Sequence, residues 1–338
     1  MTGTPLNPAH IQQVAFGFMG SRTLLSAVEL GLFTELTKGA ATADELTKRL
    51  GLHPRSARDF LDALVALELL ARDETGRYVN TPETNAFLDR NKPDYIGGLL
   101  EMAGRRLYGF WNNLTTALKT GEPQNETAGD PTTFEKLYAD PQRLELFLGA
   151  MTGVSRMVAR VLAEKFPWDR YKNMIDIGTA QGCVPVTLAQ QHPHLQCGGF
   201  DLPPVKPIFE RFAAANGVGG RVRFYAGDFM KDELPSADVL VMGHILHDWD
   251  LPTKRHLIAA AHKALSKGGV LIAYDMMIDD ERRANAMGLL MSLNMLIETA
   301  GGFDYTGADC RKWFSESGFT DVHTVPLAGP HSMTVGTK

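Results

Sequence analysis

Three features are scarce in this chain of 338 residues: cysteine, long apolar runs and clustered basic charge. The three cysteines, Cys183, Cys197 and Cys310, form no CxxC pair and no even disulfide framework, so we expect a reducing, cytoplasmic location. We expect no apolar run of membrane-spanning length, and the first residues lack the charged and apolar regions of a signal peptide. These absences argue against a secreted or membrane protein.

The charge balance narrows the class of partner. The formal net charge is -5, and no long basic run occurs, so an extended surface for nucleic acid is not expected. With 44% hydrophobic and 22% charged residues, the chain has the composition of a globular protein, and its length suits two domains. The expected partner is therefore a small molecule, not a nucleic acid or a membrane.

From about Ala9 to Leu88 the sequence has helical periodicity, with apolar residues at three- and four-residue spacing. Thr42 and Glu45 fit a capping box, and the helix that it opens ends at Gly51. A second helix and two short strands around a polar glycine turn (69–80) complete a winged-helix outline. Apolar residues near the N-terminus exceed what one small unit can bury, so we expect this domain to pair with a second copy.

A winged helix can also bind DNA, with its second helix in the major groove. In that helix Arg55 and Arg58 are accompanied by Asp59, Asp62 and Glu68, so the charge that dominates DNA affinity is missing. Packing is favoured, and a DNA-binding regulator remains an alternative.

Residues 95–170 are expected to form a helical connector, interrupted by a polar loop at 120–130. Aromatic and sulfur-containing side chains at helical spacing are core residues more often than pocket residues. An interdomain cleft would nevertheless suit a flat substrate. The candidate substrate residues of this connector are Trp111, Phe147 and Met151.

The most informative segment reads MIDIGTAQGC from Met174 onward. A short apolar run predicts a buried parallel strand, and Gly178 and Gly182 allow a sharp turn and a close ligand. Asp201 ends the next predicted strand, where its carboxylate can accept from both hydroxyls of a ribose. A strand–glycine–helix unit serves NAD, FAD and S-adenosylmethionine alike. Ala180 replaces the second glycine of the dinucleotide pattern, which argues against a pyrophosphate lying on the turn, and a sulfonium cofactor needs no such approach.

From residue 173 onward the pattern alternates strands with helices, which predicts a doubly wound α/β sheet. The last two strands, 319–326 and 332–335, have no helix between them and should pair antiparallel. A parallel sheet that ends in an antiparallel hairpin is typical of a class I methyltransferase and unlike a dehydrogenase. The expected parallel strands are 173–178, 196–201, 221–225, 237–242 and 269–275.

Polar residues follow the later strands at their carboxyl ends, where ligands of such sheets bind. After the third strand, Gly227 precedes Asp228, which can accept from an adenine amino group, and Phe229 can cover the ring. The fourth strand is followed by HILHDWD and the fifth by Asp275. A cofactor site is therefore expected at this edge of the sheet.

The ordered set DIGTAQG, GFDLPPV, AGDF, HILHDWD and GGFDYT, behind the winged-helix outline, resembles the small-molecule O-methyltransferases of the caffeate and acetylserotonin O-methyltransferase family. The resemblance covers nearly the whole chain; HDWD is its most specific element and DIGTAQG the most altered. It implies S-adenosylmethionine as cofactor with S-adenosylhomocysteine as product, no metal, an intertwined homodimer and a small phenolic or polyketide-type substrate of bacterial secondary metabolism. The implied cofactor residues are Gly178, Asp201, Gly227, Asp228, Phe229, Ser155 and Gly243, and the further candidate substrate residues are His244, Met291 and Asn294.

The resemblance also implies that His247 is the general base. A phenol has a pKa of about 10 and attacks poorly at neutral pH, whereas an imidazole, which titrates near about 6.5, can take its proton. The family supports this base with two acids, typically Glu, and the matching residues here are Asp275 and Asp304. Each is one methylene shorter, so direct contact with the imidazole needs a closer backbone or a bridging water. A metal site of His244, His247 and Asp248 is not expected, because that spacing needs a helix.

The sequence thus predicts three regions: a winged-helix dimerisation domain (1–94), a helical connector lining the substrate cleft (95–170) and a cofactor-binding methyltransferase domain (171–338). The predicted activity is methylation of a hydroxyl on a small aromatic metabolite. Proximity-driven C- or N-methylation on the same fold is the alternative, and a DNA-binding regulator or an NAD-dependent dehydrogenase is disfavoured.

Overall fold

The computed structural model describes residues 6–126 and 138–338. The chain forms two compact units, Met1–Tyr108 and Gly109–Lys338. Their boundary falls inside the region expected to be a connector, so residues 95–108 are grouped with the first unit and 109–170 with the second. The end of the expected polar loop at 120–130 lies outside the described residues.

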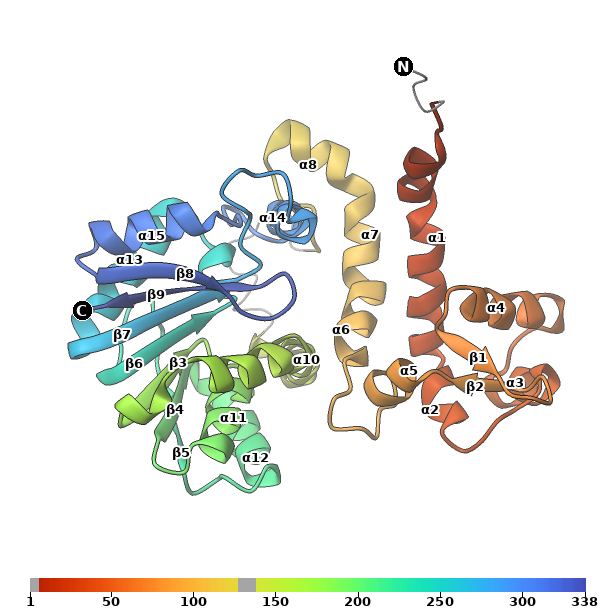
Figure 1. Cartoon of the computed structure of the whole chain (residues 1–338), viewed down its shortest axis with the longest axis horizontal. Helices are drawn as coiled ribbons and strands as arrows, with labels where there is room; N and C mark the ends of the chain where they lie inside the picture. Colours follow the sequence, from red (N-terminus) through yellow and green to blue (C-terminus); the bar gives the residue numbers. More distant parts are fainter. Residues whose placement is uncertain (1–5, 127–137) are drawn as a thin grey trace, which may run out of the picture. The chain divides into compact units, whose positions relative to one another are not determined.

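The first unit is helical, with one small hairpin (Figure 1). The predicted capping box is confirmed: Thr42 accepts from the Glu45 amide, the Glu45 carboxylate accepts from the Thr42 amide, and Gly51 closes the helix in the left-handed conformation. The predicted helices and hairpin occur in the predicted order, while the winged-helix interpretation stays a prediction. The elements are α1 (Ala9–Glu29), α2 (Leu32–Leu36), α3 (Ala43–Leu50), α4 (Pro54–Ala66), β1 (Leu70–Arg72), β2 (Tyr78–Asn80), α5 (Pro82–Phe87), α6 (Gly97–Met102) and a π-helical turn (Ala103–Leu107).

The core of this unit covers only part of α1. Leu25, Ala27 and Val28, near the C-terminal end of the helix, are buried. The first half exposes large apolar side chains instead, and such a contiguous apolar stretch marks an interaction surface. The exposed side chains are Ile11, Val14, Phe16, Phe18 and Met19.

The second unit holds a seven-stranded sheet in the order β5-β4-β3-β6-β7-β9-β8. Strands β3 to β7 are parallel, and β9 pairs antiparallel with both β7 and β8, which confirms the predicted α/β fold with its C-terminal hairpin. The strands are β3 (Asn173–Ile177), β4 (Gln196–Asp201), β5 (Val222–Ala226), β6 (Ala237–Gly243), β7 (Leu265–Asp275), β8 (Thr320–Pro326) and β9 (Ser332–Thr337).

Helices cover both faces of this sheet (Figure 1). Side chains of a strand alternate between the two faces, so Val239 and Val241 pack in one core and Leu240 and Met242 in the other. The first core contains α10 (Pro141–Lys165), α11 (Cys183–Gln191) and α12 (Lys206–Ala215); the second contains α13 (Leu251–Ala264) and α15 (Gly307–Glu316). Helices α8 (Leu114–Thr120) and α14 (Ala286–Glu298) also belong to this unit, and the short α7 (Tyr108–Phe110) lies at the boundary between the two units.

Helix α10 corrects one expectation, because it is long and apolar enough to cross a membrane by length and composition. Its buried residues, among them Leu144, Leu148 and Leu162, belong to the core of the second unit. A core helix of a globular protein passes the same test, so α10 is weak support for a membrane span. The three cysteines are free thiols, and all are buried.

Candidate functional site

The turn between β3 and α11 has the backbone that its sequence demands. Gly178 and Gly182 have positive φ angles of 69° and 90°, and Ala180 between them also has a positive φ of 51°. A side chain on Gly178 would place its Cβ 2.2 Å from Cδ1 of Ile245. The left-handed Ala180 directs its amide to Oδ2 of Asp201 at 2.9 Å. The turn is therefore fixed by hydrogen bonding as well as by glycine.

Asp201 is buried at the carboxyl end of β4. It accepts from the amides of Ala180 and, at 2.8 Å, Leu202, and the hydroxyl of Tyr138 also bonds to it. Burial raises the pKa of Asp201 to about 6, against these hydrogen bonds. Asp201 therefore lies buried beside the glycine turn, and its binding of ribose hydroxyls stays a prediction.

The AGDF segment follows β5 at the same edge of the sheet. The ring of Phe229 packs edge-on against Trp249, with 5.8 Å between the ring centroids. Asp228 accepts from the Met230 amide and pairs with Lys231 at 3.0 Å. The contact of Asp228 and Phe229 with an adenine stays a prediction.

Two of the predicted cofactor glycines have a packing reason to be glycine. A Cβ on Gly243 would lie 1.9 Å from the Tyr274 ring, and one on Gly227 would lie 2.6 Å from the Phe200 ring. Another predicted cofactor residue, Ser155 on α10, forms a hydrogen bond with Tyr274. Ser155 and Gly243 therefore both pack around one buried tyrosine at the end of β7.

The predicted base and its two acids come together in the structure. His247 is buried on a short turn, Leu246–Asp248, after β6. Its Nδ1 lies 3.3 Å from Oδ1 of Asp304 and 3.7 Å from Oδ1 of Asp275. The shorter side chains therefore reach the imidazole directly, although the contacts lack the alignment of a hydrogen bond.

The electrostatics of this cluster favour protonated His247. Burial by itself lowers the pKa of His247, but the carboxylates of Asp275, Asp248 and Asp304 outweigh it and raise the pKa to about 10. Burial raises the pKa of Asp275 to about 7, opposed by His247. His247 is therefore protonated at neutral pH, and the ionisation of each group depends on the charge of the other.

His244 follows Gly243 in a strained conformation, with a φ of 55°. Such backbone is uncommon for residues other than glycine and clusters at functional sites. Its amide donates to the Tyr274 carbonyl at 3.0 Å, and its Nδ1 lies 3.7 Å from Oδ1 of Asp275. Atoms of the kind that can bind a metal, from His244, His247 and Asp275, lie within 4.8 Å of one another. Burial lowers the pKa of His244, so this neighbour of the base is neutral.

Two of the predicted substrate residues touch each other. Nε1 of Trp111 donates to Oδ1 of Asn294 at 2.9 Å, which joins the region before α8 to α14. Met291 lies one turn earlier on α14 and is half-buried. Phe147 packs against the first core, and Met151 is half-buried on the same helix, α10.

Four site residues were missed by the sequence reasoning: Tyr305, Ser292, Lys254 and His331. The Tyr305 hydroxyl donates to Oδ2 of Asp275, and Ser292 accepts from the Asp304 amide at 3.1 Å. Tyr305 stands in the quoted GGFDYT segment, and Lys254 interrupts the apolar face of α13. Those two signals were present in the sequence, whereas Ser292 and His331 had none.

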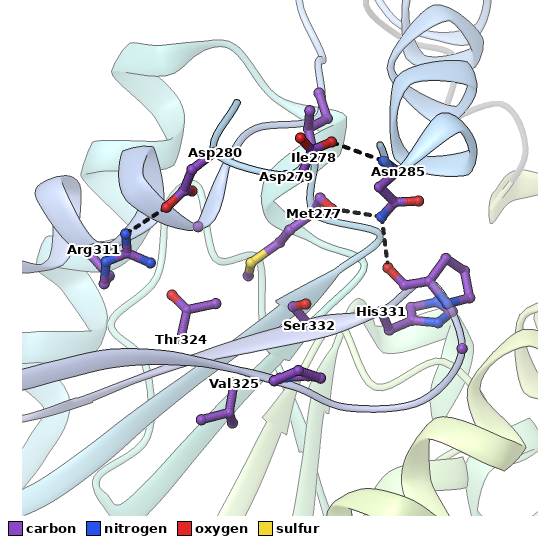
Figure 2. A pocket seen from close by; sticks show the side chains of 14 residues that line it. Met277, Ile278, Asp279, Asp280, Asn285, Arg311, Thr324, Val325, His331 and Ser332 are labelled. Carbon is purple, nitrogen blue, oxygen red and sulfur yellow. Dashed lines mark hydrogen bonds and ion pairs between the residues drawn. The ribbon is translucent and has the colours of Figure 1, made fainter. Parts of the chain in front are cut away.

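His331 reaches the site from the loop between β8 and β9. Its ring packs edge-on against that of His244, with 5.0 Å between centroids. Figure 2 shows how this loop is held: the Asn285 amide group donates to the carbonyls of Met277 and Pro330, at 2.8 and 3.0 Å. A cavity lies beside it, lined by the segment that follows β7, the start of α15 and the hairpin, and Arg311 and Asp280, which form an ion pair, are among its lining residues.

The sheet order, the glycine turn, the two acids after β4 and β5 and the His–Asp–Trp turn after β6 together define a class I methyltransferase. Comparison with known proteins identifies the branch. Residues 111–320 match the model of the O-methyltransferase domain, and residues 12–90 match that of the O-methyltransferase dimerisation domain.

Curated relatives match over most of their length. The chain is 46% identical to the tetracenomycin polyketide synthesis 8-O-methyl transferase TcmO of Streptomyces glaucescens, over 98% of this chain and 97% of TcmO. It is 43% identical to the N,N-dimethyltransferase OxyT of Streptomyces rimosus, over 82% of each chain. The solved structure of PigF with SAH superposes with a TM-score of 0.86 at 26% identity, covering 98% of this chain and 100% of PigF.

The chain therefore belongs to the O-methyltransferase family, and it is an S-adenosylmethionine-dependent O-methyltransferase with a dimerisation domain.

Proposed function

We propose that this enzyme methylates a hydroxyl of a polyketide-derived aromatic compound, with His247 as the general base. The observation that carries the proposal is the placement of buried His247, whose Nδ1 faces Asp304 at 3.3 Å and Asp275 at 3.7 Å. The identity to TcmO, named for an 8-O-methylation in polyketide synthesis, supports the acceptor class.

S-adenosylmethionine supplies a methyl group activated by its sulfonium sulfur. The residues proposed to hold it are those at the carboxyl ends of β3 to β6: Gly178, Asp201, Gly227, Asp228, Phe229 and Gly243, with Ser155 from α10. We likewise propose that the substrate is contacted by Trp111, Phe147, Met151, His244, Met291 and Asn294.

His247 has one task in this scheme, which is to take the proton of the acceptor hydroxyl. Asp304 and Asp275 orient the ring through Nδ1 and stabilise the imidazolium that forms. Their charge also gives His247 a pKa of about 10, close to that of a phenol. Proton transfer between the two is then nearly balanced, so the phenolate forms readily at the moment of attack.

A raised pKa has a cost at neutral pH, because most of the free enzyme then carries the proton on His247. Activity should therefore rise with pH across the neutral range, as that proton is lost. The rise in kcat/KM reports this ionisation of the free enzyme.

The test uses the full-length protein, labelled S-adenosylmethionine and a panel of hydroxylated naphthoates, anthraquinones and related polyketide aromatics. His247→Ala should lower kcat by about 10²–10⁴, the usual contribution of a general base. His256→Ala, an exposed histidine on α13, is the matched control and should leave kcat unchanged. A loss under about tenfold in His247→Ala, with cofactor binding intact, would remove the base from the mechanism.

N- or C-methylation is the second candidate, because a relative 43% identical is named as an N,N-dimethyltransferase. An amine attacks as its free base and needs only proximity. NMR of the product identifies the methylated atom. A product methylated on nitrogen or carbon, formed at similar rates by His247→Ala and the wild type, would select this candidate.

We further propose that the exposed apolar half of α1 pairs with a second copy of the chain, giving a homodimer in the cytosol. The match to a dimerisation domain and the three buried, free cysteines support this. Ile11→Glu combined with Phe18→Glu should convert the dimer to monomers in analytical ultracentrifugation; a dimer that persists at micromolar concentration would rule out this face.

A further inference from the structure

Lys254 is the least expected residue of the catalytic unit. It lies in the first turn of α13 and is 0% exposed. Its neighbours on the same helix face are the buried residues Leu257, Ile258 and Ala261. A buried ammonium group is costly unless its charge is compensated, and lysine is almost never fully buried without a partner.

The ammonium group touches both segments that carry the catalytic residues. Nζ donates a hydrogen bond to the carbonyl of Trp249, which directly follows the turn bearing His247. It also lies 3.6 Å from the centroid of the Phe303 ring and 5.8 Å from that of Tyr305, the two neighbours of Asp304. A cation over the face of an aromatic ring is attracted to it, more so when water is excluded. Lys254 therefore links the turn of the base to the loop of its acid.

The charges around His247 show why a cation is needed there. Asp248, Asp275 and Asp304 are three acids close to one imidazole, and all three act on Lys254. Burial lowers the pKa of Lys254 to about 8, and these carboxylates limit the fall, so the group is charged at neutral pH. The other titratable groups that face this cluster are Asp250, His244, His331 and Tyr305.

We propose that Lys254 is a positioning residue for methyl transfer: its buried ammonium fixes the Trp249 carbonyl against Phe303 and offsets the negative charge around His247. The proposal rests on His247 acting as the base. With the ammonium in place, the imidazole holds its proton less tightly and is free to take the substrate's proton at lower pH. Without the ammonium group, the three carboxylates would face only one positive charge, that of protonated His247.

The test is the pH dependence of kcat/KM in the full-length enzyme. Lys254→Met should move the rising limb to higher pH; a displacement of one pH unit lowers activity about tenfold at pH values below the limb. Lys263→Met is the matched control, since it removes an exposed lysine from the same helix, and its limb should not move. An unmoved limb in Lys254→Met, whatever its kcat, would overturn the proposal.

Lys254→Arg provides a second, independent test, because it does not place a methionine in the buried site. Wild-type Lys254 loses its charge above about pH 8, whereas a guanidinium stays charged. The ratio of activity at pH 9 to that at pH 7 should therefore be several-fold larger in Lys254→Arg than in the wild type. Calorimetry should show that the variant binds S-adenosylhomocysteine with wild-type affinity. If the activity ratios of such a variant and the wild type are equal, Lys254 does not offset the negative charge around His247.

The two proposals fail in different ways. If His247→Ala keeps most of its activity, the base role is wrong. If His247→Ala loses activity at least a hundredfold while the Lys254 variants keep the wild-type pH profile, the base stands and the role of Lys254 is wrong.

Discussion

The hydroxyl of Tyr305 donates a 2.5 Å hydrogen bond to Oδ2 of Asp275, and both side chains are buried. This contact supports the ionised form of a carboxylate that burial would otherwise neutralise. Tyr305 therefore contacts Asp275, the carboxylate that in turn faces His247.

Tyr305→Phe should destabilise the protein and change its pH profile. Leaving the buried Asp275 oxygen without a donor costs about 1–3 kcal/mol, measured as a fall in the free energy of unfolding by denaturant titration. The pKa of Asp275 should rise, so His247 loses negative charge beside it and the rising limb of kcat/KM moves to lower pH. Tyr171→Phe, a partly buried tyrosine of the same unit, should leave the limb in place; a Tyr305→Phe limb at the wild-type position would contradict this coupling.

Asp304→Asn should distinguish the effect of the negative charge of Asp304 from the effect of its shape on the orientation of His247. The amide keeps the shape of the side chain but removes the nearest negative charge, 3.3 Å from Nδ1. The pKa of His247 falls, so the rising limb moves to lower pH, and kcat falls at its plateau because the imidazolium is less stabilised. Rate–pH curves measure both effects. Asp321→Asn, at an exposed left-handed position that asparagine tolerates, is the control; a shift to higher pH in Asp304→Asn would refute the charge argument.

Gly243→Ala tests the packing reason for that glycine. The new Cβ would lie 1.9 Å from the buried Tyr274 ring, and overpacking of this kind costs about 1–3 kcal/mol or more. We expect a lower midpoint of thermal unfolding even without cofactor. Gly220→Ala, where nothing lies within 4 Å of the new atom, should unfold like the wild type. A fully stable Gly243→Ala that fails only to bind cofactor would assign the glycine to the ligand instead.

His331→Phe should make the free energy of unfolding fall less steeply as the pH is lowered. Burial lowers the pKa of folded His331 below the value of about 6.5 expected in the unfolded chain. Below about pH 6.5 the unfolded state therefore binds more protons at this residue than the folded state does. The free energy of unfolding of the wild type consequently falls as the pH is lowered. The free energy of unfolding of His331→Phe, relative to wild type, should improve between pH 7 and pH 5, by at most about 1.4 kcal/mol per pH unit. The exposed His323→Phe should show no such trend, and its absence in His331→Phe would refute the assignment.

The sheet could be predicted from the sequence because its strands are short apolar runs followed by glycine turns or acids. The predicted strand positions, the antiparallel hairpin and the Thr42 capping box agree with the structure to within a few residues. His247, Asp275 and Asp304 were singled out through the resemblance to the O-methyltransferase family, and their catalytic roles remain predictions. They lie close together in the structure because parallel strands end at one edge of a sheet.

The contacts that tune this site could not be predicted in the same way. His331 lies 84 residues beyond His247 in the chain, and only the turn held by Asn285 brings it to His244. The direct approach of two aspartates to the imidazole depends on backbone positions that no motif encodes. Lys254 was overlooked because a lysine in a helix is usually solvated, although its spacing from Leu257 and Ile258 placed it on the buried face.

The burial of the three cysteines has a practical consequence for studying this enzyme. Burial raises the pKa of Cys183 to about 11 and those of Cys197 and Cys310 to about 12, so almost no thiolate is present at neutral pH. Thiolate is the form that reacts with maleimides and iodoacetamides. A single cysteine introduced on the surface, for example in place of the exposed His256 of α13, can thus carry a fluorophore or spin label while the native thiols stay unlabelled.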